Sequence, residues 1–129
     1  MRYPLLNLLA CPMCKNFPLR LYVIEKKVSE RDYAVTKPFC DYYCGRHEKS
    51  VSSLDINKLE CESCVKEDVL SGVLLCEKCG RWYPIINGIP FMYPDSRRLH
   101  PKVKSREEEF LKKYRDLLPS DVREKIKWS

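Results

Sequence analysis

The stretch that decides the fold is Cys76-Glu77-Lys78-Cys79-Gly80-Arg81-Trp82-Tyr83-Pro84-Ile85-Ile86-Asn87-Gly88-Ile89-Pro90-Phe91-Met92. It begins with a Cys-x-x-Cys pair, and Gly80 follows the pair at a position where left-handed backbone costs least. It ends in two apolar segments separated by Asn87-Gly88, the dipeptide that type I′ hairpin turns prefer. The pattern predicts a metal-binding turn that leads into a β-hairpin.

Two prolines indicate where this hairpin lies in its sheet. Pro84 and Pro90 have no N–H to donate to a neighbouring strand, so we expect both strands at or near a sheet edge. An apolar sheet edge is either an aggregation hazard or a docking surface, and we interpret this one as a docking surface. Its apolar residues are Ile85, Ile86, Ile89, Phe91 and Met92.

A second Cys-x-x-Cys pair lies far upstream, in Cys11-Pro12-Met13-Cys14. Zn²⁺ favours tetrahedral thiolate coordination, and a two-residue spacer lets one tight turn present both sulfurs of a pair to the same ion. The two pairs therefore predict a closed structural zinc site made of Cys11, Cys14, Cys76 and Cys79. A rubredoxin-like iron site is the alternative that these ligands leave open.

The composition argues against an enzyme and against a membrane protein. With 129 residues, 44% hydrophobic and 33% charged, the chain is expected to be soluble, with one compact domain plus appendages. No apolar run approaches the roughly 20 residues of a membrane helix, and no secretion signal is visible, so a cytoplasmic location is expected. A shell of four thiolates leaves no open position for a reactive water. With only 4 glycines, the chain has little material for a phosphate-binding loop.

The order of these patterns predicts an α+β protein with three parts. Residues 1–25 and 66–96 would form a discontinuous zinc-ribbon domain around a small antiparallel sheet. Residues 26–65 would form a cysteine-rich insertion, and residues 97–129 a basic helical tail. Within the ribbon we expect a short apolar helix or turn before Cys11, a strand over residues 17–24 with Leu19, Leu21 and Val23 on its buried face, and a strand over residues 68–75.

The insertion carries a second cysteine quartet: Cys40, Cys44, Cys61 and Cys64. These residues could bind a second zinc ion, form disulfides if the source is a hyperthermophile, or remain free thiols. His47 could replace one ligand. A lone exposed histidine is the simpler interpretation, because four cysteines already complete a tetrahedral shell.

The tail combines positive charge with an amphipathic pattern. Residues 97–129 contain 11 lysines and arginines against 6 acidic residues, a net charge of +5. Ser105 and Glu108 fit a capping box at the start of a helix that ends before Pro119, and Val122 and Ile126 suggest a second helix. We expect the apolar stripe to pack on the protein itself rather than on a partner. The stripe consists of Phe110, Leu111, Tyr114, Leu117 and Leu118.

Two motifs together carry a family resemblance. They are Leu8-Leu9-Ala10-Cys11-Pro12-x-Cys14, and Gly72-Val73-Leu74-x-Cys76-x-x-Cys79-x-Arg81-x-Tyr83-Pro84-Ile85-x-x-Gly88-Ile89-Pro90-x-Met92. The chain resembles the tRNA methyltransferase activator subunit family, whose members are small zinc-ribbon proteins. Its cysteine-rich insertion and long basic tail look like those of an archaeal version.

The resemblance implies a non-catalytic subunit that forms heterodimers with class I S-adenosylmethionine-dependent methyltransferases. Such partners modify tRNA, rRNA and the translation termination factor, and the partner alone binds S-adenosylmethionine. In the family, an edge strand of the ribbon pairs with the methyltransferase sheet, which adds Tyr83 to the docking residues named above. RNA would be contacted indirectly or through the basic tail. The alternative function is a nucleic-acid-binding zinc ribbon of the transcription or translation machinery, which the charge of the tail supports.

Overall fold

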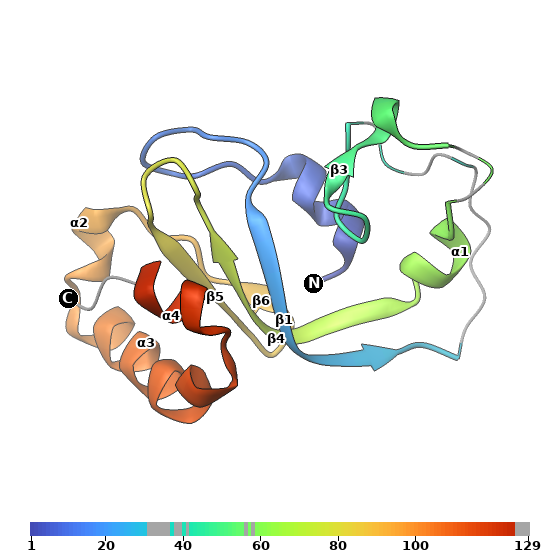
Figure 1. Cartoon of the computed structure of the whole chain (residues 1–129). Coiled ribbons are helices and arrows are strands. Elements are labelled where there is room, and N and C mark those ends of the chain that lie inside the picture. Colours follow the sequence, from blue (N-terminus) through green and yellow to red (C-terminus); the bar gives the residue numbers. More distant parts are fainter. Residues whose placement is uncertain (31–36, 38–39, 41, 56, 58, 126–129) are drawn as a thin grey trace.

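The computed structural model describes residues 1–30, 37, 40, 42–55, 57 and 59–125. Its centre is a four-stranded antiparallel sheet in the order β1-β4-β5-β6, which confirms the predicted α+β class (Figure 1). The strands are β1 (Arg20–Val28), β4 (Glu67–Leu75), β5 (Trp82–Ile86) and β6 (Ile89–Pro90). Strands on either side of the insertion are therefore neighbours, because β1 pairs with β4.

The β5–β6 hairpin forms as the sequence predicts. Ile86 pairs with Ile89, and the turn between them has positive φ at Asn87 (51°) and Gly88 (78°), as a type I′ turn requires. The short strand β6 is at the edge of the sheet, and β5 is the next strand inward. Pro84 is tolerated in β5 because it needs only to accept a bond, which its carbonyl does from the N–H of Phe91 at 2.9 Å.

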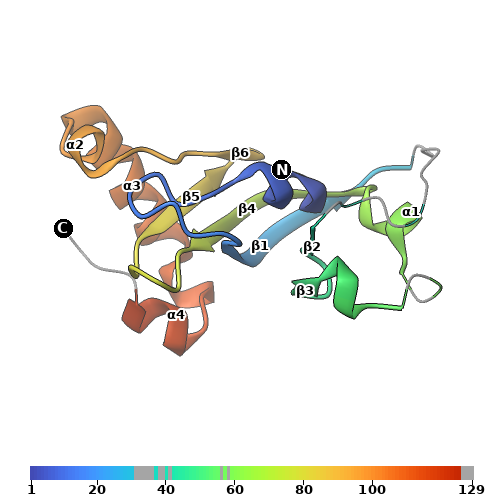
Figure 2. The same cartoon turned by 90° about the horizontal axis from the view of Figure 1, so that it is seen from above.

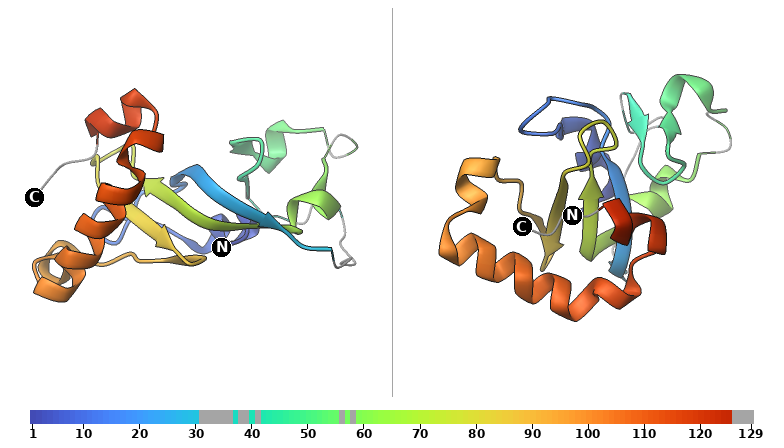
Figure 3. Two further views of the ribbon diagram at one scale, coloured as in Figure 1. Left: turned by 90° about the horizontal axis from the view of Figure 1, so that it is seen from below. Right: turned by 60° about the vertical axis from the view of Figure 1, so that its left-hand side comes forward.

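Both faces of the sheet are covered (Figure 3). On one face, Leu74 and Tyr83 pack with residues of the N-terminal segment, such as Leu6. On the other face, Val73 and Trp82 pack against the C-terminal helices. Strand β4 is therefore buried on both sides toward its end, which explains why its last residues, Val73, Leu74 and Leu75, are consecutive apolar residues rather than an alternating pattern.

The first helix of the chain lies next to the insertion, which extends from one end of the sheet (Figure 2). A 3₁₀ helix, η1 (Tyr3–Leu8), is followed by the first cysteine pair. The insertion contains a small two-stranded sheet, a 3₁₀ turn and one helical turn: β2 (Tyr43–Cys44), β3 (Lys49–Ser50), η2 (Val51–Ser53) and α1 (Cys61–Cys64). The Asn7 side chain joins η1 to the insertion, because its amide bonds the carbonyl of Tyr43 at 2.9 Å and accepts from the N–H of Tyr43 at 2.8 Å.

The tail packs on its own protein, as predicted. It forms α2 (Asp95–Arg98), α3 (Pro101–Tyr114), η4 (Arg115–Leu117) and α4 (Ser120–Lys125). The stripe residues Phe110, Leu111, Tyr114 and Leu118 are buried against the sheet together with Val122, whereas Leu117 is 65% exposed. The predicted partner of Val122, Ile126, lies outside the described residues. Among the described helices, none has the length and apolar character needed to cross a membrane.

The predicted capping box is wrong. Helix α3 begins at Pro101 rather than after Ser105, and its N-cap is His100, whose Nδ1 accepts from the N–H of Lys102 at 3.2 Å. A proline at the first helical position has the required φ and no N–H left unpaired, so it starts the helix without a serine cap. The short helix α2 was not predicted at all, because its four residues, Asp95–Arg98, are too few to show a period.

The first strand also differs from its prediction. β1 extends to Val28, so it enters the residues assigned to the insertion. Leu19 and Leu21 are buried as expected, but Val23 is 39% exposed. The register of β1 against β4 shifts on both sides of Glu25, and such an irregularity breaks the alternation of buried and exposed side chains. In the predicted apolar turn before Cys11, Leu6 is buried and Leu8 is exposed.

Candidate metal centre and partner-binding edge

The fold brings the four cysteines of the two Cys-x-x-Cys pairs together. The sulfurs of Cys11, Cys14, Cys76 and Cys79 all lie within 4.8 Å of one another. Two of the distances are 3.6 Å, between Cys11 and Cys79, and 3.4 Å, between Cys14 and Cys76. A zinc ion with bonds of about 2.3 Å to four sulfurs needs sulfur–sulfur distances of roughly 3.8 Å, so the cluster has the size of a tetrahedral metal site.

The two pairs have the same backbone structure. In the first, the N–H of Lys15 bonds the carbonyl of Cys11 at 2.9 Å, and in the second, the N–H of Gly80 bonds the carbonyl of Cys76 at 2.8 Å. The residue after each pair is left-handed, with φ of 64° at Lys15 and 77° at Gly80. The sequence predicted this conformation for the glycine, but the equivalent lysine gave no signal.

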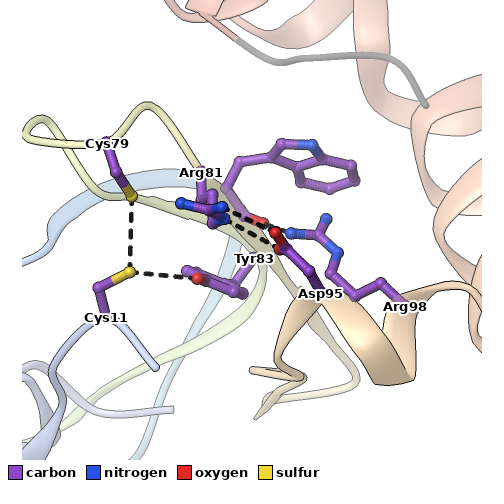
Figure 4. A network of polar contacts seen from close by, with 7 residues as sticks. Cys11, Cys79, Arg81, Tyr83, Asp95 and Arg98 are labelled. Atoms are coloured by element: carbon purple, nitrogen blue, oxygen red, sulfur yellow. Dashed lines mark hydrogen bonds and ion pairs between the residues drawn. The ribbon is translucent and has the colours of Figure 1, made fainter. Parts of the chain in front are cut away.

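Backbone and side-chain donors point at the sulfur of Cys11. Burial works against ionisation of this thiol, but the N–H groups of Cys14 and Met13 and the hydroxyl of Tyr83 stabilise the thiolate and lower its pKa to about 6. Figure 4 shows the Cys11 sulfur between the sulfur of Cys79 and the Tyr83 hydroxyl, which lies 3.3 Å away. Tyr83 is fully buried in the sheet, so it links the core of the fold to the metal centre.

Burial raises the pKa of the Cys76 thiol to about 12, even though the N–H groups of Cys79 and Lys78 point at it. The pKa of Cys11 is thus lowered and that of Cys76 is raised within one cluster. Four thiolates so close together cannot all ionise without a cation. Binding of a metal ion here would therefore release protons, and a divalent ion would reduce the charge of the four thiolates to net −2.

Arg81 compensates part of this charge. Its guanidinium donates to the sulfur of Cys79 and so helps to lower the pKa of that thiol, against the opposing effect of burial. The same guanidinium makes two bonds to Asp95 in α2, at 2.9 Å and 2.7 Å, and the two side chains lie side by side in Figure 4. Asp95, which the sequence suggested only as a solvated cap or turn residue, therefore orients a cation beside the metal centre.

Arg98 is a structural residue that sequence reasoning missed. Its Nη1 bonds the carbonyl of Trp82 at 2.7 Å, its Nε bonds Glu107 at 3.0 Å, and its guanidinium lies over the rings of Trp82 and Tyr83. Its Nη2 also forms an ion pair with Glu107. One arginine thus joins α2, β5 and α3 directly behind the metal centre. Only the three-dimensional structure shows this, because the partners are 9 and 16 residues away.

The predicted docking residues divide into buried and accessible ones. Tyr83 and Ile85 are fully buried in the core of this protein, so neither side chain is exposed at the sheet edge. They point inward because β5 is the second strand of the sheet and is covered on both faces. Ile89, at the edge, is 56% exposed. The remaining residues are partly buried: Ile86 against the tail, Met92 against the main core and Phe91 under the guanidinium of Arg106, which lies 4.6 Å from its ring centre.

The second cysteine quartet lies around one small cavity in the insertion. Cys40, Cys44, Cys61 and Cys64 all line this cavity, together with His47. Burial, followed by the charges of the neighbouring cysteines, raises the pKa of Cys64 to about 12. None of the eight cysteines, all of which are in the described part of the chain, forms a disulfide. His47 is exposed, as its simpler interpretation expects.

Comparison with known protein families gives one clear match. A family model described as Trm112p-like protein matches residues 2–88, which include both cysteine pairs of the metal centre and all of the insertion. A search of curated proteins found no match.

Proposed function

Because the chain belongs to the Trm112p-like family, we propose that it is a non-catalytic subunit that activates and stabilises class I S-adenosylmethionine-dependent methyltransferases. Family membership supports a methyltransferase-activator role in general. The finer proposal concerns the reaction: the partner would bind S-adenosylmethionine and modify a component of the translation machinery, namely tRNA, rRNA or the translation termination factor. The complex would be a heterodimer in the cytoplasm.

The observation that carries the proposal is the edge of the sheet. Strand β6 ends the sheet in the order β1-β4-β5-β6, and Ile89 exposes more than half of its surface there. A partner strand added at this edge would gain main-chain hydrogen bonds, while Ile89 and the accessible parts of Phe91 would supply selectivity. The role of Tyr83 and Ile85 would be indirect, because their burial sets the position of β5 and hence of the edge.

Zn²⁺ is the proposed cofactor of the centre formed by Cys11, Cys14, Cys76 and Cys79. Thiolates are soft ligands and a four-cysteine shell is typical of structural zinc. The metal would tie the segment before β1 to the turn between β4 and β5, because one pair precedes β1 and the other joins β4 to β5. The ribbon domain of residues 1–25 and 66–96, the insertion of residues 26–65 and the tail of residues 97–129 would then assemble around a single metal-anchored sheet.

The first experiment is native mass spectrometry of the tagged protein isolated from its own cells. Recovery with a class I methyltransferase and bound zinc is the expected result, and it would also name the partner. Recovery with RNA polymerase or ribosomal components and no methyltransferase would contradict the proposal.

The edge is tested separately with Ile89→Asp. This change places a charge on the proposed interface and should abolish binding to the identified methyltransferase, whereas zinc content and the folded state should be unchanged. The matched control is Ser96→Asp, which places the same charge at an exposed position outside the proposed interface, in α2. This variant should bind normally. Normal binding by the Ile89→Asp variant would show that β6 is not the interface.

Nucleic-acid binding is the second candidate, favoured by basic side chains on the exposed face of α3 and just after it. These are Lys102, Lys104, Arg106, Lys112, Lys113 and Arg115. Deletion of the tail would be an unsuitable test, because the tail covers Val73 and Trp82. Lys112→Glu with Lys113→Glu keeps the buried stripe. If the tail serves as an RNA arm, this pair should weaken RNA binding by the complex and reduce its dependence on salt, while methyltransferase association stays intact.

A further inference from the structure

The insertion has only a small apolar core of its own, although Tyr43 and Cys64 also pack into the main core. Its strands β2 and β3 have two residues each. Its apolar cluster contains four buried residues, Cys44, Val51, Leu59 and Cys61, so half of that cluster consists of cysteine. Segments with so little apolar surface usually depend on a metal ion or on disulfides.

The cysteines of the insertion are placed around one common space. Cys61 and Cys64 are the first and last residues of the single helical turn α1, and this spacing puts both on one side of the turn. Cys44 ends β2, and the adjoining Gly45 is packed so tightly against η1 that an added Cβ would come within 2.5 Å of Leu6. The cavity that these thiols share with Cys40 has a volume of about 20 Å³, enough for one water molecule and hence for one ion.

The charges at this cavity favour an anionic centre. Arg46 lines it, and its Nη1 is buried without a hydrogen-bond partner in the part of the chain that the structure describes. The other end of the guanidinium is held by Glu60 at 3.3 Å and by Glu67 at 3.9 Å. A buried N–H needs an acceptor, and a thiolate of a zinc centre with net charge −2 would provide one. A disulfide is neutral and would leave this donor without a charged partner.

We propose that Cys40, Cys44, Cys61 and Cys64 bind a second Zn²⁺ ion, which holds the insertion together. Arg46 would play the part that Arg81 plays at the first centre: a guanidinium beside the thiolates, oriented by a carboxylate. Among the described residues, only the first quartet has three or more sulfurs within 4.8 Å of one another. Binding of the ion would therefore draw the second set of thiols together around the cavity. This inference does not depend on the identity of the methyltransferase.

The test is the zinc content of the full-length chain, purified under reducing conditions and measured by native mass spectrometry. We expect two zinc ions per wild-type chain and one in the double variant Cys61→Ser with Cys64→Ser. His47→Ala is the matched control, because it changes another residue at the same cavity and should keep two ions. One zinc ion in the wild type, or two in the double variant, would overturn the proposal.

A second measurement covers the case in which the double variant does not fold. The wild-type chain is stripped of metal under reducing conditions and titrated with Co²⁺, whose thiolate charge-transfer absorption reports each four-sulfur centre. Absorption that rises to two equivalents supports the second site, and saturation at one equivalent contradicts it. Alkylation of the unreduced, unfolded chain after metal removal should modify all eight cysteines. Modification of only four to six would indicate disulfides and overturn the proposal.

Discussion

The hydroxyl oxygen of Tyr83 lies 3.3 Å from the sulfur of Cys11, although 72 residues separate the two in sequence. The contact joins the buried centre of β5 to the first cysteine pair. The candidate metal site of Cys11, Cys14, Cys76 and Cys79 is thus in direct contact with the core of the sheet. Changes at the centre and changes in the core should therefore affect each other.

Tyr83→Phe tests this link directly. The variant keeps the ring in the core and removes only the hydroxyl that donates to the Cys11 thiolate. We expect a loss of about 10-fold in zinc affinity, as for other residues that support metal ligands, with the fold unchanged. Competition with a chromophoric chelator would measure the affinity. Tyr42→Phe is the control, because Tyr42 is 70% exposed, and an equal loss in both variants would contradict the assigned role.

The left-handed residues after the two cysteine pairs should respond in opposite directions. Gly80→Ala introduces a Cβ at a φ of 77° and should destabilise the protein by about 1 kcal/mol. Lys15→Gly relieves the same strain at a φ of 64° and should not destabilise. Thermal unfolding of the zinc-loaded protein measures both. A lower unfolding temperature for Lys15→Gly than for Gly80→Ala would contradict the equivalence of the two turns.

Arg98→Ala should strongly destabilise the packing of the tail on the sheet. The change removes the ion pair with Glu107 and leaves that carboxylate, which is only 13% exposed, without its partner. We expect a loss of about 2–4 kcal/mol in the free energy of unfolding. Denaturant unfolding measures it, with Arg97→Ala as the exposed neighbour for control. A loss below that of the control would show that Arg98 does not hold the helices in place.

Two adjacent leucines test whether the tail belongs to the folded unit. Leu118 is 3% exposed and Leu117 is 65% exposed. Leu118→Ala creates a cavity next to Val122 and should lose about 2–4 kcal/mol, whereas Leu117→Ala should change stability by less than about 0.5 kcal/mol. A single cooperative unfolding transition is expected in both. A separate early transition for the tail in the wild-type protein would contradict its integration.

Removal of the metal should disrupt the sheet as well as the centre. Chelation leaves four closely spaced sulfurs without a cation, so some of them must take up protons, and the segment before β1 loses its cross-link to the β4–β5 turn. We expect the unfolding temperature to fall and the near-ultraviolet dichroism of Trp82 to weaken. Acid should have the same effect, because protons compete with the ion for the thiolates. Unchanged unfolding after complete metal removal would show that the centre has no structural role.

The sequence by itself determined the features that depend on local chemistry. The Cys-x-x-Cys spacing, the Asn87-Gly88 turn and the period of the tail helix each depend on residues a few positions apart, and the structure has all of them. The prolines also placed the hairpin correctly near the sheet edge. In these cases the backbone preference of the residues and the tertiary contacts favour the same conformation.

Only the tertiary structure decided which side chains are accessible and which distant charges meet. Ile85 and Ile89 are the same residue type, yet Ile85 is fully buried and Ile89 is 56% exposed. The difference arises because Ile85 is in β5, which has a strand on each side, whereas Ile89 is in β6, which ends the sheet. The Arg81–Asp95 and Arg98–Glu107 pairs exist because α2 folds back over β5 and against α3. Their energy comes from proximity in space, and separation along the chain carries no information about it.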